Sequence, residues 1–278
     1  IGVPERGEYI RVMLAELGRI ASHLVFYACF GGDLGGQTAL LFGFKEREMI
    51  HDILDEVTGS RLTTNFFRPG GSVHDVPDTF IPRVTSFLKH LEKTMVDYER
   101  FLSTNIIVLE RTKGIGILSK EDAIAYGCSG PVLRASGVSY DVRKNDPYGI
   151  YSQLDFNVPV TYNGDTYDRY VVRIAEIHES IKILRQCIKQ FPEGPYRGQE
   201  KASIRLKPGS YYSATETAKG LYATYVVAVS GDKPYRIHTR GPSFANLAAL
   251  NTMVQGHKIS DLVSILATLD PVIPEIDR

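Results

Sequence analysis

A long helical periodicity is the strongest pattern in the sequence. Between Glu8 and Thr38, apolar side chains recur every three or four residues, which is the period of an α-helix packed on a core. These apolar positions are Ile10, Met13, Leu14, Leu17, Ile20, Ala21, Leu24, Val25 and Ala28. About 20 helical residues would span about 30 Å, which is also the thickness of a bilayer core. Charged residues recur along the stretch and would be costly in a bilayer, so we predict a core helix.

Several charged residues allow two interpretations. Glu16, Arg19 and His23 are spaced i, i+3 and i+7, so they share one face of the predicted helix. They form either a surface stripe or a buried polar seam, and the apolar flanking positions are the argument for the seam. Arg68 precedes Pro69-Gly70-Gly71, and it belongs either to a surface turn or to an anchor for a carboxylate or carbonyl group.

Four glycines surround Asp33 and predict a sharp bend after the helix. Gly31, Gly32, Gly35 and Gly36 let the backbone turn tightly and approach another group closely. The pattern is neither GxGxxG nor a P-loop, which argues against nucleotide phosphate binding. Beside apolar side chains, desolvation would raise the pKa of Asp33 unless a cation pairs with it. Asp33 is therefore either a functional carboxylate or a helix-capping residue.

The rest of the chain predicts further helices and a small β element. Ser119 and Asp122 form a capping box for a short helix that stops at Gly127. Further helices are predicted over 39–57, 78–102, 106–112, 165–190, 244–253 and 259–269. Strands are predicted over 153–161, 222–230 and 235–239, a structured loop over 130–151, and a plain loop over 194–210.

These elements predict an α+β fold that is predominantly α. We divide the chain into a helical core at 1–129, a structured loop with a long helix and a small β element at 130–240, and C-terminal helices with a tail at 241–278 that complete the core. A length of 278 residues is enough for one large core or two unequal ones.

Composition excludes several classes of protein. The 32 Lys and Arg balance 32 Asp and Glu, and this zero net charge argues against nucleic acid as a main partner. No apolar run approaches the ~18 residues of a membrane span. No signal-peptide pattern follows Ile1, which is not Met, so we expect a chain cut from a longer one. Cys29, Cys128 and Cys187 form no CxxC, so we expect three buried core residues and a reducing compartment.

Ordered motifs run through nearly the whole chain. They are Arg19-Ile-Ala-Ser-His23-Leu24, Gly32-Asp33-Leu34-Gly35, Phe44-Lys-Glu46-Arg47-Glu48, Arg68-Pro-Gly-Gly71, Leu133-Arg-Ala-Ser-Gly137, Tyr140-Asp-Val-Arg143 and the tail from Asp270-Pro271 to Arg278. Together they resemble the D subunit of the proton-pumping NADH–quinone oxidoreductase, respiratory complex I, a family related to the large subunit of nickel–iron hydrogenases. The resemblance implies a multihelical core like that of the hydrogenase large subunit, with a small antiparallel β element.

The resemblance also locates two departures from the family pattern. Family members carry an N-terminal part ahead of Ile1 that holds the His and Tyr thought to contact the quinone headgroup, so those residues have no counterpart here. Between about Gly194 and Ser213 the chain is shorter than typical members. Because the motif from Tyr211 to Gly220 survives, we expect the sheet to be kept and a peripheral helix to be lost.

The tail decides between hydrogenase chemistry and its loss. Hydrogenase large subunits end in a pattern like Asp-Pro-Cys-x-x-Cys-x-x-His, whose cysteines help to hold a nickel–iron centre. Here Val272 and Glu275 stand at the cysteine positions, and Arg278 stands at the His position. Nickel and iron in such a centre need thiolates, and a protonated Arg cannot be a ligand. We therefore expect no metal site.

The resemblance implies that the former metal cavity became part of a quinone pocket. Asp33 would line that pocket and take part in proton coupling, while Val272 and Asp277 match family positions associated with quinone-site inhibitors. The chain would bind no cofactor itself. Quinone would be the substrate, and electrons would come from an iron–sulphur cluster in a partner subunit.

The implied partners are other subunits of the complex. They are the small iron–sulphur subunit, the C subunit, a ferredoxin-like subunit and the membrane-arm subunit of the quinone site, with NAD(H) bound elsewhere. The expected location is peripheral, on the cytoplasmic side of the bacterial inner membrane, and the isolated chain should be inactive. Two alternatives remain open: a nickel–iron hydrogenase-like large subunit, and an assembly scaffold without quinone contact.

Overall fold

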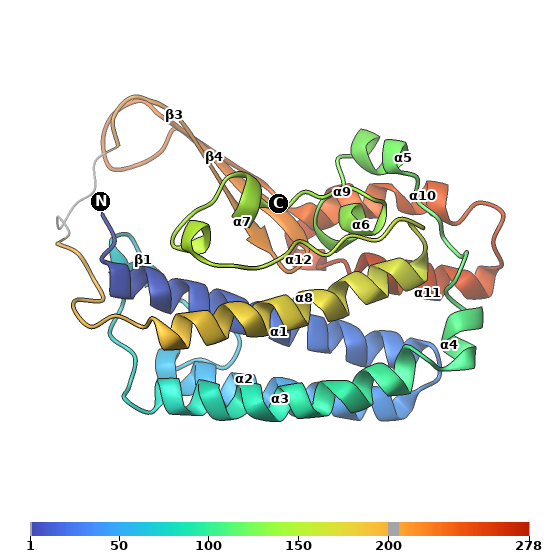
Figure 1. Cartoon of the computed structure of the whole chain (residues 1–278). Helices are drawn as coiled ribbons and strands as arrows, with labels where there is room; N and C mark the ends of the chain where they lie inside the picture. The colour runs from blue at the N-terminus through green and yellow to red at the C-terminus, as the bar shows by residue number, and fades with distance from the viewer. Residues whose placement is uncertain (1, 200–205, 278) are drawn as a thin grey trace.

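Long helices form one side of the molecule in this computed structural model, which describes residues 2–199 and 206–277. Four of them lie side by side along one half of the fold, while short helices and a small sheet occupy the other half (Figure 1). The four are α1 (Glu5–Asp33), α2 (Gln37–Thr58), α3 (Phe80–Leu102) and α8 (Thr166–Lys189). The α+β, predominantly α prediction is confirmed.

The other half of the fold is built from shorter elements. The helices are α4 (Ile106–Glu110), α5 (Lys120–Ala125), α6 (Gly130–Ala135), α7 (Val142–Asn145), the 3-10 helix η1 (Tyr151–Gln153), α9 (Pro242–Ala248), α10 (Leu250–Met253), α11 (Ile259–Leu269) and α12 (Ile273–Ile276). The strands are β1 (Phe67–Arg68), β2 (Gly71–Ser72), β3 (Gly209–Thr217), β4 (Gly220–Ala228) and β5 (Arg236–Arg240). Strands β3, β4 and β5 form an antiparallel sheet in that order.

Helix α1 is the centre of the core. It packs against α2, α8 and α11, and 72 % of its most apolar 18-residue stretch is buried. By length and composition α1 could cross a bilayer, but its apolar side chains are already covered by other helices of the same chain. Each buried side chain of Leu or Phe size contributes about 1.5–3 kcal/mol to stability. The prediction of a core helix is confirmed.

The predicted strand at 153–161 is wrong. Its alternation is real, because Leu154 and Phe156 are buried while Asp155 and Asn157 are exposed. Among the described strands, none pairs with this segment. Instead, the backbone N–H groups of Asp155 and Asn157 donate to side chains on α8. A loop lying over a helix therefore produced the pattern of a half-buried strand.

Other predicted elements agree with the structure in outline. Ser119 is the N-cap of α5, because its hydroxyl accepts from the Asp122 N–H, while the Asp122 carboxylate accepts from the Ser119 hydroxyl. The stretch 130–151 contains α6, α7 and the start of η1, so it is helical in part. Arg68 is the last residue of β1, directly before the turn into β2, and its guanidinium donates to Asn65 at the surface, which confirms the surface-turn interpretation.

The predicted loop and lost helix at 194–213 fall partly outside the described residues, which omit 200–205. Within 194–199 and 206–208, no helix forms. Strand β3 begins at Gly209, slightly inside the predicted loop, and it pairs with β4 along its whole length. The expectation that the sheet is kept is confirmed.

Candidate functional site

A network of buried charges joins five elements of the fold. Four arginines, four carboxylates and one histidine in it are each at most 4 % exposed. The members, which we call the buried charge network, are Glu16, Arg19 and His23 on α1, Arg134 on α6, Asp141 and Arg143 at α7, Arg173 and Glu176 on α8, and Glu216 on β3. Buried charges destabilise a fold unless they are paired. Here four arginines can pair with four carboxylates, so the charges of the network balance. The buried-seam interpretation of the α1 residues is confirmed.

Glu16 is the most completely bonded carboxylate of this network. It accepts hydrogen bonds from Arg19 (3.2 Å), Arg143 (3.0 Å), Tyr151 (2.6 Å) and Ser180 (2.6 Å). Burial alone would raise its pKa, but the two arginines and the two hydroxyl donors outweigh burial and lower the pKa of Glu16 to about 2. Glu16 therefore stays ionised and holds α1, α7, η1 and α8 together.

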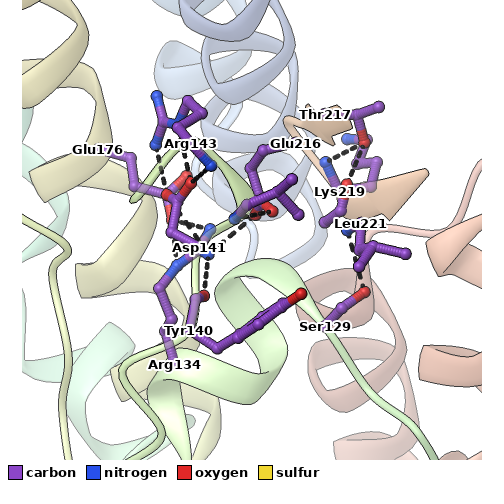
Figure 2. A network of polar contacts seen from close by, with 12 residues as sticks. Ser129, Arg134, Tyr140, Asp141, Arg143, Glu176, Glu216, Thr217, Lys219 and Leu221 are labelled. Carbon is purple, nitrogen blue, oxygen red and sulfur yellow. Dashed lines mark hydrogen bonds and ion pairs between the residues drawn. The ribbon is translucent and has the colours of Figure 1, made fainter. Parts of the chain in front are cut away.

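Arg134 is the branch point of the network (Figure 2). Its Nη2 lies 2.6 Å from Glu176 Oε1, and its Nη1 lies 2.9 Å from Glu216 Oε1. Glu176 also accepts from His23 Nε2 at 2.8 Å. Burial lowers the pKa of His23 to about 4, so the ring is neutral near pH 7 and its proton sits on Nε2. His23 Nδ1 has no hydrogen-bond partner among the described residues.

Glu216 differs from the other carboxylates of the network. Burial, supported by the nearby charge of Asp141, raises its pKa against the opposing effect of Arg134, whereas the pKa values of Glu16, Asp141 and Glu176 are lowered. Glu216 is therefore the member of the network best able to take up a proton. Its position at the end of β3 places it beside the turn into β4.

Asp33 lies at the end of α1, where the predicted glycine bend is only partly correct. Helix α1 continues through Gly31 and Gly32, and the chain turns only after Asp33, with Gly35 at φ +92°. Gly31 is needed for close packing, because a Cβ there would overlap Ala39 on α2. Asp33 is not an N-cap, since Gly36 occupies that position of α2. Asp33 is exposed to solvent, but the protein atoms that surround its carboxyl group desolvate it in part and raise its pKa.

The C-terminal tail starts at Asp270, which ends α11 in a left-handed conformation at φ 52°. Lys219 forms an ion pair with Asp270, and Arg173 Nε lies 3.7 Å from the same carboxylate. Val272 directly precedes α12 and is 38 % exposed, and Asp277 directly follows α12 and is also exposed. Among the described residues, no hydrogen bond or ion pair joins the predicted site residues to one another.

Cys29 lies near the C-terminal end of α1. It is exposed, so the prediction of three buried cysteines is wrong for Cys29, although Cys128 and Cys187 are buried. Partial burial and then the charges of Asp33 and Asp270 raise the pKa of the Cys29 thiol. The charges of both carboxylates therefore act on the same thiol.

A groove of about 700 Å³ lies elsewhere, between the first half of α1, the segment around Tyr148 and β3. Its lining includes Arg11, Phe67 and Glu216, and none of the predicted site residues. Nothing in the sequence pattern predicted this groove. Within the described part of the chain, no three His, Cys, Asp or Glu side chains are grouped as metal ligands.

Of the buried charge network, the sequence pattern indicated only Glu16, Arg19 and His23 as a possible buried seam. Arg134, Arg173 and Glu176 were not singled out as candidate residues, nor was Lys219. The available signal was the position of Arg173 and Glu176 in α8, next to apolar residues that face the core. A charged residue amid core-facing residues of a long helix indicates either a solvated face or a buried partner, and only the fold distinguishes them.

Comparison with known proteins identifies the family. Residues 33–208 and 200–278 match the family described as the 49 kDa subunit of respiratory-chain NADH dehydrogenase. The chain belongs to this family. The two matched segments overlap at residues 200–208, within the stretch from about Gly194 to Ser213 that was predicted to be shorter than in typical members. The chain is thus a subunit of an oxidoreductase complex.

Curated relatives support the assignment over the full length of the chain. The chain is 48 % identical to the D subunit of the NADH-quinone oxidoreductase of Clostridium beijerinckii, of which it covers 75 %. It is 49 % identical to the D subunit from a Dehalococcoides mccartyi strain and covers 76 % of it. It is also 44 % identical to the C/D subunit of Bacteroides fragilis, where the match spans 52 % of that longer chain.

Proposed function

We propose that this chain forms part of the quinone-reduction pocket of a proton-translocating NADH–quinone oxidoreductase, next to the terminal iron–sulphur cluster of a neighbouring subunit. The observation that supports the proposal is that the charges of Asp33, near the end of α1, and Asp270, at the start of the tail, both act on the exposed Cys29 thiol. Quinone reduction adds negative charge to the quinone oxygens, which then take up protons. A carboxyl group with a raised pKa, as at Asp33, is suited to proton exchange there.

The partners and location follow from the same proposal. The C subunit is the partner with the most direct support, because a C/D relative carries both parts in one chain. The small iron–sulphur subunit would supply electrons, the ferredoxin-like subunit would belong to the same arm, and the membrane-arm subunit would complete the quinone site. The chain would then lie at the cytoplasmic face of the inner membrane as a peripheral subunit.

Asp33→Asn is the variant that tests this function. In the assembled enzyme, we expect quinone reduction or its coupling to proton pumping to fall by about 10- to 100-fold, because the amide cannot exchange a proton at this site. NADH oxidation with ferricyanide, which bypasses the quinone pocket, should be unchanged and would report assembly. Asp97→Asn, at an exposed position on α3, is the matched control. Normal turnover and pumping in the Asp33 variant would contradict the proposal.

We further propose that the chain holds no redox metal of its own. Val272 and Glu275 supply no thiolate at the positions where hydrogenase tails have cysteines, and Glu275 instead accepts a hydrogen bond from Ser243 at 2.6 Å. Elemental analysis of the purified complex should therefore find no nickel. Nickel in a one-to-one ratio with this subunit would instead support the hydrogenase-like alternative.

A further inference from the structure

The turn between β3 and β4 connects the buried charge network to the tail. Glu216 lies near the end of β3, and Lys219 lies in the turn itself; both are labelled in Figure 2. The Arg19 guanidinium donates to the carbonyl oxygens of Glu216 (2.7 Å) and Thr217 (2.8 Å), and the Glu216 N–H donates to the Tyr148 hydroxyl. The backbone that carries Lys219 is therefore fixed from two sides.

Lys219 extends from this fixed turn to the first residue of the tail. Its side chain is 13 % exposed, and its ammonium group forms an ion pair with Asp270. Burial lowers the pKa of Lys219, and the charge of Asp270 opposes that effect and favours the ammonium form. The Asn246 side chain also donates to the Lys219 carbonyl oxygen. The ion pair between Lys219 and Asp270 thus holds the start of the tail against the β3–β4 turn.

Asp270 has a conformation that needs such support. Among residues 2–199 and 206–277 it is the one non-glycine residue with positive φ. Asp tolerates the left-handed region better than most residues, but the conformation still costs energy. The direction in which the chain leaves α11, and hence the position of Val272, depends on this residue.

A second cation competes for the same carboxylate. Arg173 is 1 % exposed, and its guanidinium lies 4.3 Å from the centre of the Phe26 ring. Its Nη1 donates to the Arg169 carbonyl oxygen, but its Nε has no hydrogen-bond partner within the described residues and lies 3.7 Å from Asp270. If the Lys219 charge is removed, Arg173 on α8 remains as the partner of Asp270. A closer contact between Asp270 and Arg173 would move the start of the tail.

We propose that Lys219 is a positioning residue, which holds Asp270 and thereby sets the position of tail residues 271–277 at the quinone pocket. This inference rests on the proposed function. Lys219 acts through Asp270 and is not assigned contact with the quinone. Loss of its charge should loosen the tail and weaken quinone and inhibitor binding more than it slows chemistry, because the wall of the pocket moves while the proton-exchanging carboxyl stays.

The test compares Lys219→Met, Lys219→Gln and Lys219→Arg in the assembled complex. We expect Met and Gln to raise the KM for quinone at least about fivefold with kcat changed less than about twofold, and Arg to restore the parent value, because only the charge is needed. Hydrogen exchange of the amides in 271–277 should become faster in Met and Gln. Lys233→Met, an exposed lysine in the β4–β5 turn of the same sheet, is the matched control.

A double variant tests whether Lys219 acts through Asp270. Combining Lys219→Gln with Asp270→Asn should raise the KM no more than the larger single effect, since both changes break one interaction. Unchanged tail exchange in Lys219→Gln, or fully additive effects, would overturn the positioning role. Faster tail exchange with an unchanged KM would instead confirm the hold on the tail and contradict the placement of the tail in the quinone pocket.

Discussion

Replacing Arg134 with methionine is expected to lower the free energy of unfolding by about 3–5 kcal/mol. Arg134 contacts Glu176 at 2.6 Å and Glu216 at 2.9 Å, and Asp141 lies 3.7 Å away. The variant would leave these carboxylates buried with one cation fewer. Urea unfolding of parent and variant, with the midpoint and slope compared, measures the change.

The matched control for this prediction is Arg185→Met on the outer side of α8. Arg185 pairs with Glu92, but its side chain is 50 % exposed, so its loss should cost no more than about 1 kcal/mol. Glu216→Gln should be less harmful in the Arg134→Met background than in the parent, because that background already lacks the guanidinium that pairs with Glu216. Equal stability of the two arginine variants would show that burial of the network is not what makes it important.

The second large effect is a loss of stability in acid. The pKa of Glu16 falls from its usual 4.5 to about 2 on folding, so the group stabilises the fold above pH 4.5 and that stability is lost as the pH falls toward 2. A shift of this size corresponds to about 3 kcal/mol. Glu176 acts in the same direction because its pKa is also lowered.

His23 extends the acid effect to higher pH. Its pKa falls from 6.5 to about 4 in the folded state, so between these values the unfolded chain binds more protons than the folded chain. The free energy of unfolding therefore decreases as the pH falls from 6.5 to 4. Unfolding midpoints in urea across pH 7 to 2 should decline continuously through both ranges.

Glu16→Gln separates the contribution of Glu16 from general acid denaturation. The variant should be less stable than the parent at pH 7, with a smaller decrease below pH 4.5, because the group that must be protonated is gone. Glu110→Gln, at an exposed position in α4, should follow the parent curve. Parallel curves for Glu16→Gln and the parent would contradict the assignment of Glu16 as a source of the acid effect.

Local patterns predicted the long elements well, and their failures share one cause. The period of α1 and the N-cap at Ser119 depend on residues a few positions apart, so the sequence contains the full information. The alternation at 153–161 was misread because a strand needs a neighbouring strand, and this segment has α8 as its neighbour. Cys29 was misplaced for the same reason, since its exposure depends on which side of α1 the other elements leave open.

By itself, the sequence determined the helix-dominant fold, the central role of α1, the family and the residue types at the tail. The tertiary structure alone decided that charges far apart in the chain meet inside the protein, such as His23 and Glu176, which are 153 residues apart. It also decided that Glu216 has a raised pKa and that Lys219 binds Asp270. The physical reason is that burial and pairing depend on which elements pack together, and both the charge state and the stability of an ionisable group follow from its partners.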